Sequence, residues 1–161
     1  MTAFSAKRLR LCVNVRMTWK RASLLGFVTA VLCFLWLFYE RAVFGNGPVT
    51  IAIQVAAAAV MVWARVTFGR RSFHAVANPT EGGLVTNGPY RYLRHPIYAA
   101  VLYFLWAGIA AHLSLANVIV ALVATAGLAV RMLAEETLIV GQYPEYAGYA
   151  ARTRRVVPFV F

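Results

Sequence analysis

The sequence has no aspartate and only five glutamates among its 161 residues, against sixteen lysines and arginines. Charged residues make up 13% of the chain and hydrophobic residues 61%, which is too apolar for an ordinary soluble domain. So basic a chain could bind nucleic acid, but its cations lie between hydrophobic runs instead of on one amphipathic face. The composition therefore predicts a single integral membrane domain and no nucleic-acid partner.

Several familiar kinds of site are also missing from the sequence. The two cysteines, Cys12 and Cys33, have no CxxC spacing and no histidine cluster beside them, so neither a zinc site nor a disulfide framework is indicated. The sequence has no GxGxxG or Walker-type loop and no HExxH motif. We expect no metal site, and any cofactor must be bound by a less standard arrangement.

Long uncharged runs are the main feature of the chain. Residues 22–39 and 49–64 flank a Gly-Asn-Gly-Pro turn and form the first two expected membrane spans. Residues 97–130 carry no formal charge and would measure about 51 Å as one helix, so we expect them to fold back around His112. The resulting spans are 96–111 and 114–131, with His112 capping or hydrating the turn. The prediction is an all-α membrane bundle with about four transmembrane helices.

Four crossings would place residues 1–21, 65–95 and 132–161 on the same side of the membrane. Arg41 is then the one Lys or Arg of the sixteen that lies on the other side. The positive-inside rule puts the basic side, with both termini, in the cytoplasm, and we expect a bacterial inner membrane. The single domain, 1–161, thus divides into a basic N-terminus (1–21), a helical hairpin (22–64), a cytoplasmic loop (65–95), a second hairpin (96–131) and a tail (132–161).

The stretch 87–98, with the sequence Asn-Gly-Pro-Tyr-Arg-Tyr-Leu-Arg-His-Pro-Ile-Tyr, is where a site is most strongly indicated. Pro96 suits the first turn of a helix, whose free N–H groups and positive dipole end would lie beside His95. Such a helix end favours a carboxylate or another anion, and Arg94 could strengthen the attraction. The alternative is that the cations are interfacial anchors and the tyrosines an aromatic belt.

A second candidate site begins at Arg131. Glu135 follows four residues later, so both side chains would lie on one face of a helix, either as a surface ion pair or as part of a site. Glu136 is rotated from Glu135 by roughly 100°. We therefore expect one carboxylate to face the bundle and the other to face water.

Four segments in order resemble a known family. They are residues 84–90 (Leu-Val-Thr-Asn-Gly-Pro-Tyr), 94–98 (Arg-His-Pro-Ile-Tyr), Arg131 with Glu135-Glu136, and a Tyr-x-x-Tyr pair at 146–149 before the basic segment 154–158. Together they resemble the membrane methyltransferases of the isoprenylcysteine carboxyl methyltransferase and phospholipid methyltransferase type, over residues 65–161. Some relatives have a glycine soon after His-Pro-x-Tyr, where this chain has Ala99 and Ala100.

The resemblance implies S-adenosylmethionine as the cofactor and Arg131 as a substrate-side residue. The cofactor contacts that it implies are Leu84, Val85, Tyr90, His95, Pro96, Ile97, Tyr98 and Glu135. Arg94 joins them through its place beside the helix end. The cofactor's carboxylate, amino group and sulfonium call for a cation or helix N-terminus, an anion, and aromatic surroundings, respectively. An acceptor that must lose a proton would also need a base, for which His95 and Glu136 are candidates.

The expected function is methyl transfer to an oxygen of a lipophilic acceptor, either a carboxyl group or an acidic phenol or pyrone hydroxyl. N-methylation of a phospholipid headgroup is the related alternative. A non-catalytic membrane docking protein and a membrane reductase using a nicotinamide cofactor are alternatives of other classes. The sequence leaves the oligomeric state open.

Overall fold

The computed structural model describes residues 3–69 and 83–157, and these residues form a helical bundle. Apart from turns and one isolated bridge, the described residues are helical, which confirms the all-α prediction. The elements are α1 (Ala3–Tyr39), α2 (Pro48–Phe68), the 3-10 turn η2 (Gly88–Arg91), α3 (Pro96–Ala111), α4 (Leu115–Val140) and α5 (Tyr146–Arg152).

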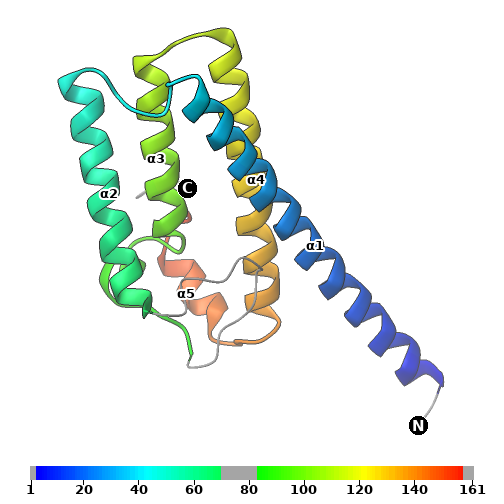
Figure 1. The fold of residues 1–161 in the computed structure, drawn as a ribbon. Coiled ribbons are helices and arrows are strands. Elements are labelled where there is room, and N and C mark those ends of the chain that lie inside the picture. Colours follow the sequence, from blue (N-terminus) through cyan, green and yellow to red (C-terminus); the bar gives the residue numbers. More distant parts are fainter. Residues whose placement is uncertain (1–2, 70–82, 158–161) are drawn as a thin grey trace.

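The long helices pack as two pairs, α1 along α4 and α2 along α3, with α3 and α4 also in contact (Figure 1). The turns that join α1 to α2 and α3 to α4 lie together at one end of the bundle. The short helix α5 and the turn η2 lie at the opposite end (Figure 1). That end gathers the polar segments of the chain, and it carries the candidate site.

Two glycines allow α1 and α4 to approach closely. A Cβ atom on Gly127 would lie 2.7 Å from the carbonyl oxygen of Gly26, and a Cβ on Gly26 would meet the carbonyl oxygen of Gly127. Buried Ala30 and Ala124 extend this crossing with further small side chains. Small residues of this kind let helix backbones touch in a membrane, where packing has to replace much of the hydrophobic driving force. The crossing brings side chains of α1 next to Arg131.

Polar contacts fix the turns at the end away from the candidate site. Buried Gln54 in α2 donates to the carbonyl oxygens of Val43 at 2.7 Å and Phe104 at 3.0 Å, and its own oxygen accepts from Gly45 N at 2.8 Å. His112, where α3 ends, lies 2.9 Å from the carbonyl oxygen of Phe44 through Nε2. These bonds satisfy backbone groups to which the lipid of a bilayer offers no hydrogen-bond partner.

Among the described residues, three helices are long and apolar enough to cross a membrane, and they identify an integral membrane protein. They cover Met17–Tyr39, Pro48–Phe68 and Leu115–Val140. The fourth apolar helix, α3, has 16 residues and is shorter. Large apolar side chains point outward from the bundle, for example Leu35 at 60% and Val55 at 63% exposure, as expected for contact with lipid.

The helix limits agree with the sequence for α3 and extend further for α1 and α4. The helix Pro96–Ala111 has the predicted limits, and Pro96 occupies its first turn. In contrast, α1 begins at Ala3 and α4 continues to Val140, past the predicted ends at 22 and 131. Hydrophobicity marks the membrane part of a helix, but a helix continues into water where its residues are good helix formers and no proline stops it.

Candidate functional site

The segment that leads into α3 is held against α2. Gly88 has a φ of +56°, and a Cβ there would lie 2.6 Å from Thr67 Oγ1. Both the backbone conformation and the lack of space therefore favour glycine at this position of η2. The buried Tyr90 ring packs on Phe68, with 5.4 Å between ring centroids. This anchoring fixes the backbone that presents Arg94 and His95.

The C-terminal segment runs beside the residues that lead into α3 and hydrogen-bonds to their backbone. Arg94 N donates to the carbonyl oxygen of Arg154 at 2.6 Å, and His95 N donates to that of Arg155 at 3.0 Å. Arg154 N in turn donates to the carbonyl oxygen of Tyr92 at 3.1 Å. Tyr149 Oη donates to Tyr90 O at 2.8 Å, which ties α5 to the same segment. Residues some 60 positions apart thus form one polar layer.

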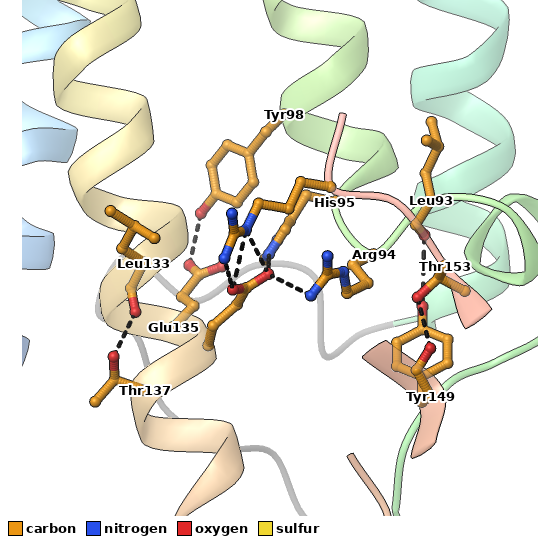
Figure 2. Close-up of polar contacts among 11 residues, drawn as sticks. Leu93, Arg94, His95, Tyr98, Leu133, Glu135, Thr137, Tyr149 and Thr153 are labelled. Carbon is orange, nitrogen blue, oxygen red and sulfur yellow. Dashed lines mark hydrogen bonds and ion pairs between the residues drawn. The ribbon is translucent and has the colours of Figure 1, made fainter. Parts of the chain in front are cut away.

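Glu136 lies at the centre of this layer and contacts three basic side chains. Its carboxylate is 3.3 Å from Arg94 Nη1 and 3.2 Å from His95 Nε2. Arg155 donates to it through Nη2 at 3.0 Å and Nε at 3.1 Å, a two-point contact. Figure 2 shows Arg94 and His95 converging on this point. Glu136 is only 8% exposed, and the two arginines outnumber its single negative charge.

Two polar atoms beside Glu136 lack well-placed partners. Arg94 Nε and Tyr146 Oη are buried without a hydrogen bond of good geometry in the part of the chain that the structure describes, although Tyr146 is close enough to Arg94 and Glu136 for weak hydrogen bonding. Tyr146 lies near enough to Arg94 and Glu136 to interact with their charges. Buried polar groups are normally satisfied, so two neighbouring exceptions beside excess positive charge would suit an anionic or accepting ligand group.

Glu135 belongs to a second network, on the neighbouring face of α4. Tyr98 Oη donates to Glu135 Oε1 at 2.5 Å (Figure 2), and Arg131 Nε donates to Tyr98 Oη at 2.5 Å. Arg131 Nε is also 3.3 Å from Glu135 Oε1, the ion pair that the spacing predicts. Arg131 is 5% exposed and Glu135 is half-buried, so the pair is not an open surface ion pair.

The two networks meet through His95 and Tyr98 at the N-terminus of α3. The two rings lie with their centroids 5.6 Å apart, and each ring contacts a different one of the adjacent glutamates. His95 is the N-cap residue of α3 and Tyr98 lies in its first turn. The positive end of this helix therefore lies between one buried and one half-buried carboxylate, both already paired with cations.

Outside the membrane spans, burial keeps the phenols of α5 neutral. Burial, followed by the charge of Glu136, raises the pKa of Tyr146 to about 12. Burial likewise raises the pKa of Tyr149, while hydrogen bonding to Glu136 raises the pKa of Arg155. At neutral pH Tyr146 is therefore a hydrogen-bond donor, and Arg155 is fully charged.

Comparison with protein families identifies the chain. The model of the isoprenylcysteine carboxyl methyltransferase (ICMT) family matches residues 50–140, which is more than half of the sequence. The chain belongs to the ICMT family. It is therefore a membrane protein of a methyltransferase family. Neither the curated proteins nor the solved structures give a match. The ICMT match includes α2, α3 and α4 and ends before α5, and α1 precedes it.

The structure brings together most of the residues singled out in the ICMT-like motifs. The residues that form the two networks or the helix start between them are Arg94, His95, Pro96, Tyr98, Arg131, Glu135 and Glu136. Tyr90 packs on Phe68 and contributes its carbonyl oxygen to Tyr149. Leu84 and Val85 are half-buried in the segment before η2, and half-buried Ile97 follows Pro96.

The expectation that one glutamate of the ICMT-like pair would face water was wrong. The side chain of Glu135 is 21% exposed and that of Glu136 is 11% exposed. The rotation between them does send them into different networks, as their spacing on a helix requires. Both are nevertheless largely covered, because Arg155 of the C-terminal segment contacts Glu136, while Tyr98 and Arg131 contact Glu135.

Sequence reasoning missed the partners that come from far away in the chain. Arg155 belongs to the basic cluster of the predicted cytoplasmic tail, where no single residue was assigned a contact, and it makes the two-point contact with Glu136. Phe27 in α1 lies under the Arg131 guanidinium, with 4.9 Å between Cζ and the ring centroid. No local spacing encodes either contact. The Tyr-x-x-Tyr pair at 146–149 was the one available signal that the tail reaches the site.

Proposed function

We propose that this protein transfers a methyl group from S-adenosylmethionine to an oxygen of a lipophilic acceptor at the cytoplasmic face of a bacterial inner membrane. One observation carries the proposal: two buried carboxylate networks meet at the N-terminus of α3. Both carboxylates and the start of α3 lie within the region that matches the ICMT family, and Arg155 joins them from beyond it. A structural core would not need so many charges at the end of an apolar bundle.

The proposed topology has four crossings, with α3 as the short third span. Its 16 residues correspond to about 24 Å of helix, and it packs between α2 and α4. The turns after α1 and α3 lie at the same end of the bundle, as a four-crossing path requires (Figure 1). The cationic end then faces the cytoplasm by the positive-inside rule.

The residues at the α3 N-terminus suit the polar groups of S-adenosylmethionine. Arg94 Nε and Tyr146 Oη, which make no hydrogen bond of good geometry, would hold its carboxylate together with the helix end. Glu135 would attract its amino group, while Leu84, Val85, Tyr90, His95, Pro96, Ile97 and Tyr98 would contact the remainder of the molecule. When bound, the cofactor supplies an electrophilic methyl group.

Arg131 would orient the acceptor. It is held at the bundle side of the site by Tyr98 and Glu135, where an anionic head could lie while an apolar tail remains in the lipid. A carboxylate acceptor is ionised at neutral pH and needs no base. Exclusion of water and alignment of the reacting groups would then supply much of the acceleration.

A hydroxyl acceptor would need a base, and the geometry favours His95 over Glu136 for that role. Glu136 already interacts with Arg94, His95 and Arg155, which stabilises its ionised form and makes it a weak proton acceptor. It can instead accept a hydrogen bond from His95 Nε2 and so orient the ring. Nδ1 would then be the atom that accepts the proton.

Calorimetric titration of the detergent-purified protein with S-adenosylmethionine and S-adenosylhomocysteine tests the proposal. We expect saturable binding that Glu135→Gln weakens by about 10-fold or more, the loss of one charge-assisted hydrogen bond. Glu145→Gln is the matched control, because Glu145 is exposed. Methyl transfer is then assayed on carboxylate, phenol and phosphatidylethanolamine acceptors. The absence of binding and of transfer by a folded sample would refute the proposal, and transfer to the amine alone would favour N-methylation.

A further inference from the structure

We propose that Phe27, on the helix that precedes the ICMT match, positions Arg131 for the acceptor. This inference rests on the proposed function, because it gives the proposed acceptor residue a partner from α1. The ring of Phe27 lies 4.9 Å from the guanidinium carbon of Arg131. A cation placed over an aromatic face at this distance is attracted by the ring, most strongly where water is excluded.

The α1–α4 crossing explains why the ring is held there. Gly26, next to Phe27, touches the backbone of Gly127, and a Cβ on Gly26 would also lie 3.6 Å from Arg131 N. The backbone of α1 therefore passes directly beside the turn of α4 that carries Arg131. Ser23 and Ala30, on the same face of α1, are 0% and 2% exposed, so the positions one turn to either side of Phe27 are packed.

Arg131 is thus held on two sides by different chemistry. On one side, Tyr98 and Glu135 bind its Nε within hydrogen-bond or ion-pair distance. On the other side lies the Phe27 ring, which attracts the cation but offers it no hydrogen-bond acceptor. A guanidinium held between these two sides keeps a fixed orientation. Phe27 is therefore a positioning residue for acceptor recognition, and α1 is part of the site as well as a membrane anchor.

Replacing Phe27 tests this role, because the ring can be removed without removing its apolar bulk. We expect Phe27→Leu to lower kcat/KM by about 2- to 30-fold, the range of a cation–π contact. The loss should lie mainly in KM for an anionic acceptor, with cofactor Kd changed less than about twofold. Phe27→Trp, which keeps an aromatic ring, should retain most of the wild-type kcat/KM that Phe27→Leu loses. Phe34→Leu is the control, because Phe34 lies two turns along α1 and packs in the hydrophobic core.

A double-mutant cycle with Arg131→Gln separates positioning from simple packing. If Phe27 acts through Arg131, Phe27→Leu has little further effect on acceptor KM once the guanidinium is gone. Equal effects of Phe27→Leu in both backgrounds, or no rescue by tryptophan, would overturn the proposal. The same double-mutant cycle, measured by thermal unfolding, gives the energy of the contact between Phe27 and Arg131. Wild-type protein that binds cofactor but methylates none of the acceptors would refute the proposed function instead, whatever the unfolding cycle shows.

Discussion

At the scale of single residues, Glu136 is the charge on which the polar layer depends. It holds Arg94 and His95 from the start of α3 and Arg155 from the C-terminal segment, and it is 8% exposed. Two of its partners are permanently cationic. Without the carboxylate they would repel each other in a poorly hydrated space, so Glu136 contributes to folding as well as to the proposed chemistry.

We therefore expect Glu136→Gln to destabilise the protein by about 3 kcal/mol, the cost of leaving buried charges unpaired. Thermal unfolding in detergent, followed by circular dichroism, measures the change. Combining Glu136→Gln with Arg155→Gln should recover part of the loss, because one unpaired cation is then removed. The exposed Glu145→Gln should leave the midpoint unchanged. A Glu136→Gln protein as stable as wild type would show that water compensates the charges of the layer.

The sequence predicts contacts of residues near each other in the chain better than contacts of distant ones. The four-residue spacing of Arg131 and Glu135 predicted their pairing, and Pro96 predicted the helix start beside His95. Arg155 and Glu136 are 19 residues apart, and their contact depends on how the tail turns back after Gly141. That path is set by tertiary packing of α5, which leaves no periodic trace in the sequence.

At the scale of the elements, the crossing of α1 and α4 determines which side chains of α1, the helix before the ICMT match, reach the site. Gly127 lies one helical turn before Arg131, and its backbone touches that of Gly26. The small residues at this crossing were not apparent as a pattern, because alanine and glycine are frequent throughout the apolar runs. Their arrangement became meaningful only when the partner helix was known.

Adding a methyl group at this crossing should separate the helices. A Cβ on Gly127 would lie 2.7 Å from the carbonyl oxygen of Gly26, and neither backbone can move without repacking. We expect Gly127→Ala to lower stability by about 1–3 kcal/mol, the usual cost of overpacking. Gly148→Ala is the control, because nothing lies within 4 Å of its added Cβ in α5. Unchanged unfolding of Gly127→Ala would indicate that the two helices cross less closely.

At the scale of the whole molecule, the proposed function requires the polar layer to face the cytoplasm, where S-adenosylmethionine is made. The path keeps this layer at the opposite end from the turns that join the helices. The turns 40–47 and 112–114 lie at one end of the bundle, and α5 and η2 lie at the other (Figure 1). The helix α3 is shorter than the three candidate spans of the described residues. If it crosses the membrane, the two termini lie on the same side; if it does not, they lie on opposite sides.

Cysteine labelling in intact bacterial cells tests the whole path at once. In a background of Cys12→Ser and Cys33→Ala, we expect a membrane-impermeant maleimide to label Asn46→Cys and Leu113→Cys from outside, because both turns are exposed at the same end of the bundle. Gln142→Cys, exposed after α4, should react only once the membrane is opened. Labelling of Asn46→Cys but not Leu113→Cys would mean that α3 does not cross. Labelling of Gln142→Cys in sealed cells would place the carboxylate networks on the outer side, away from the cofactor.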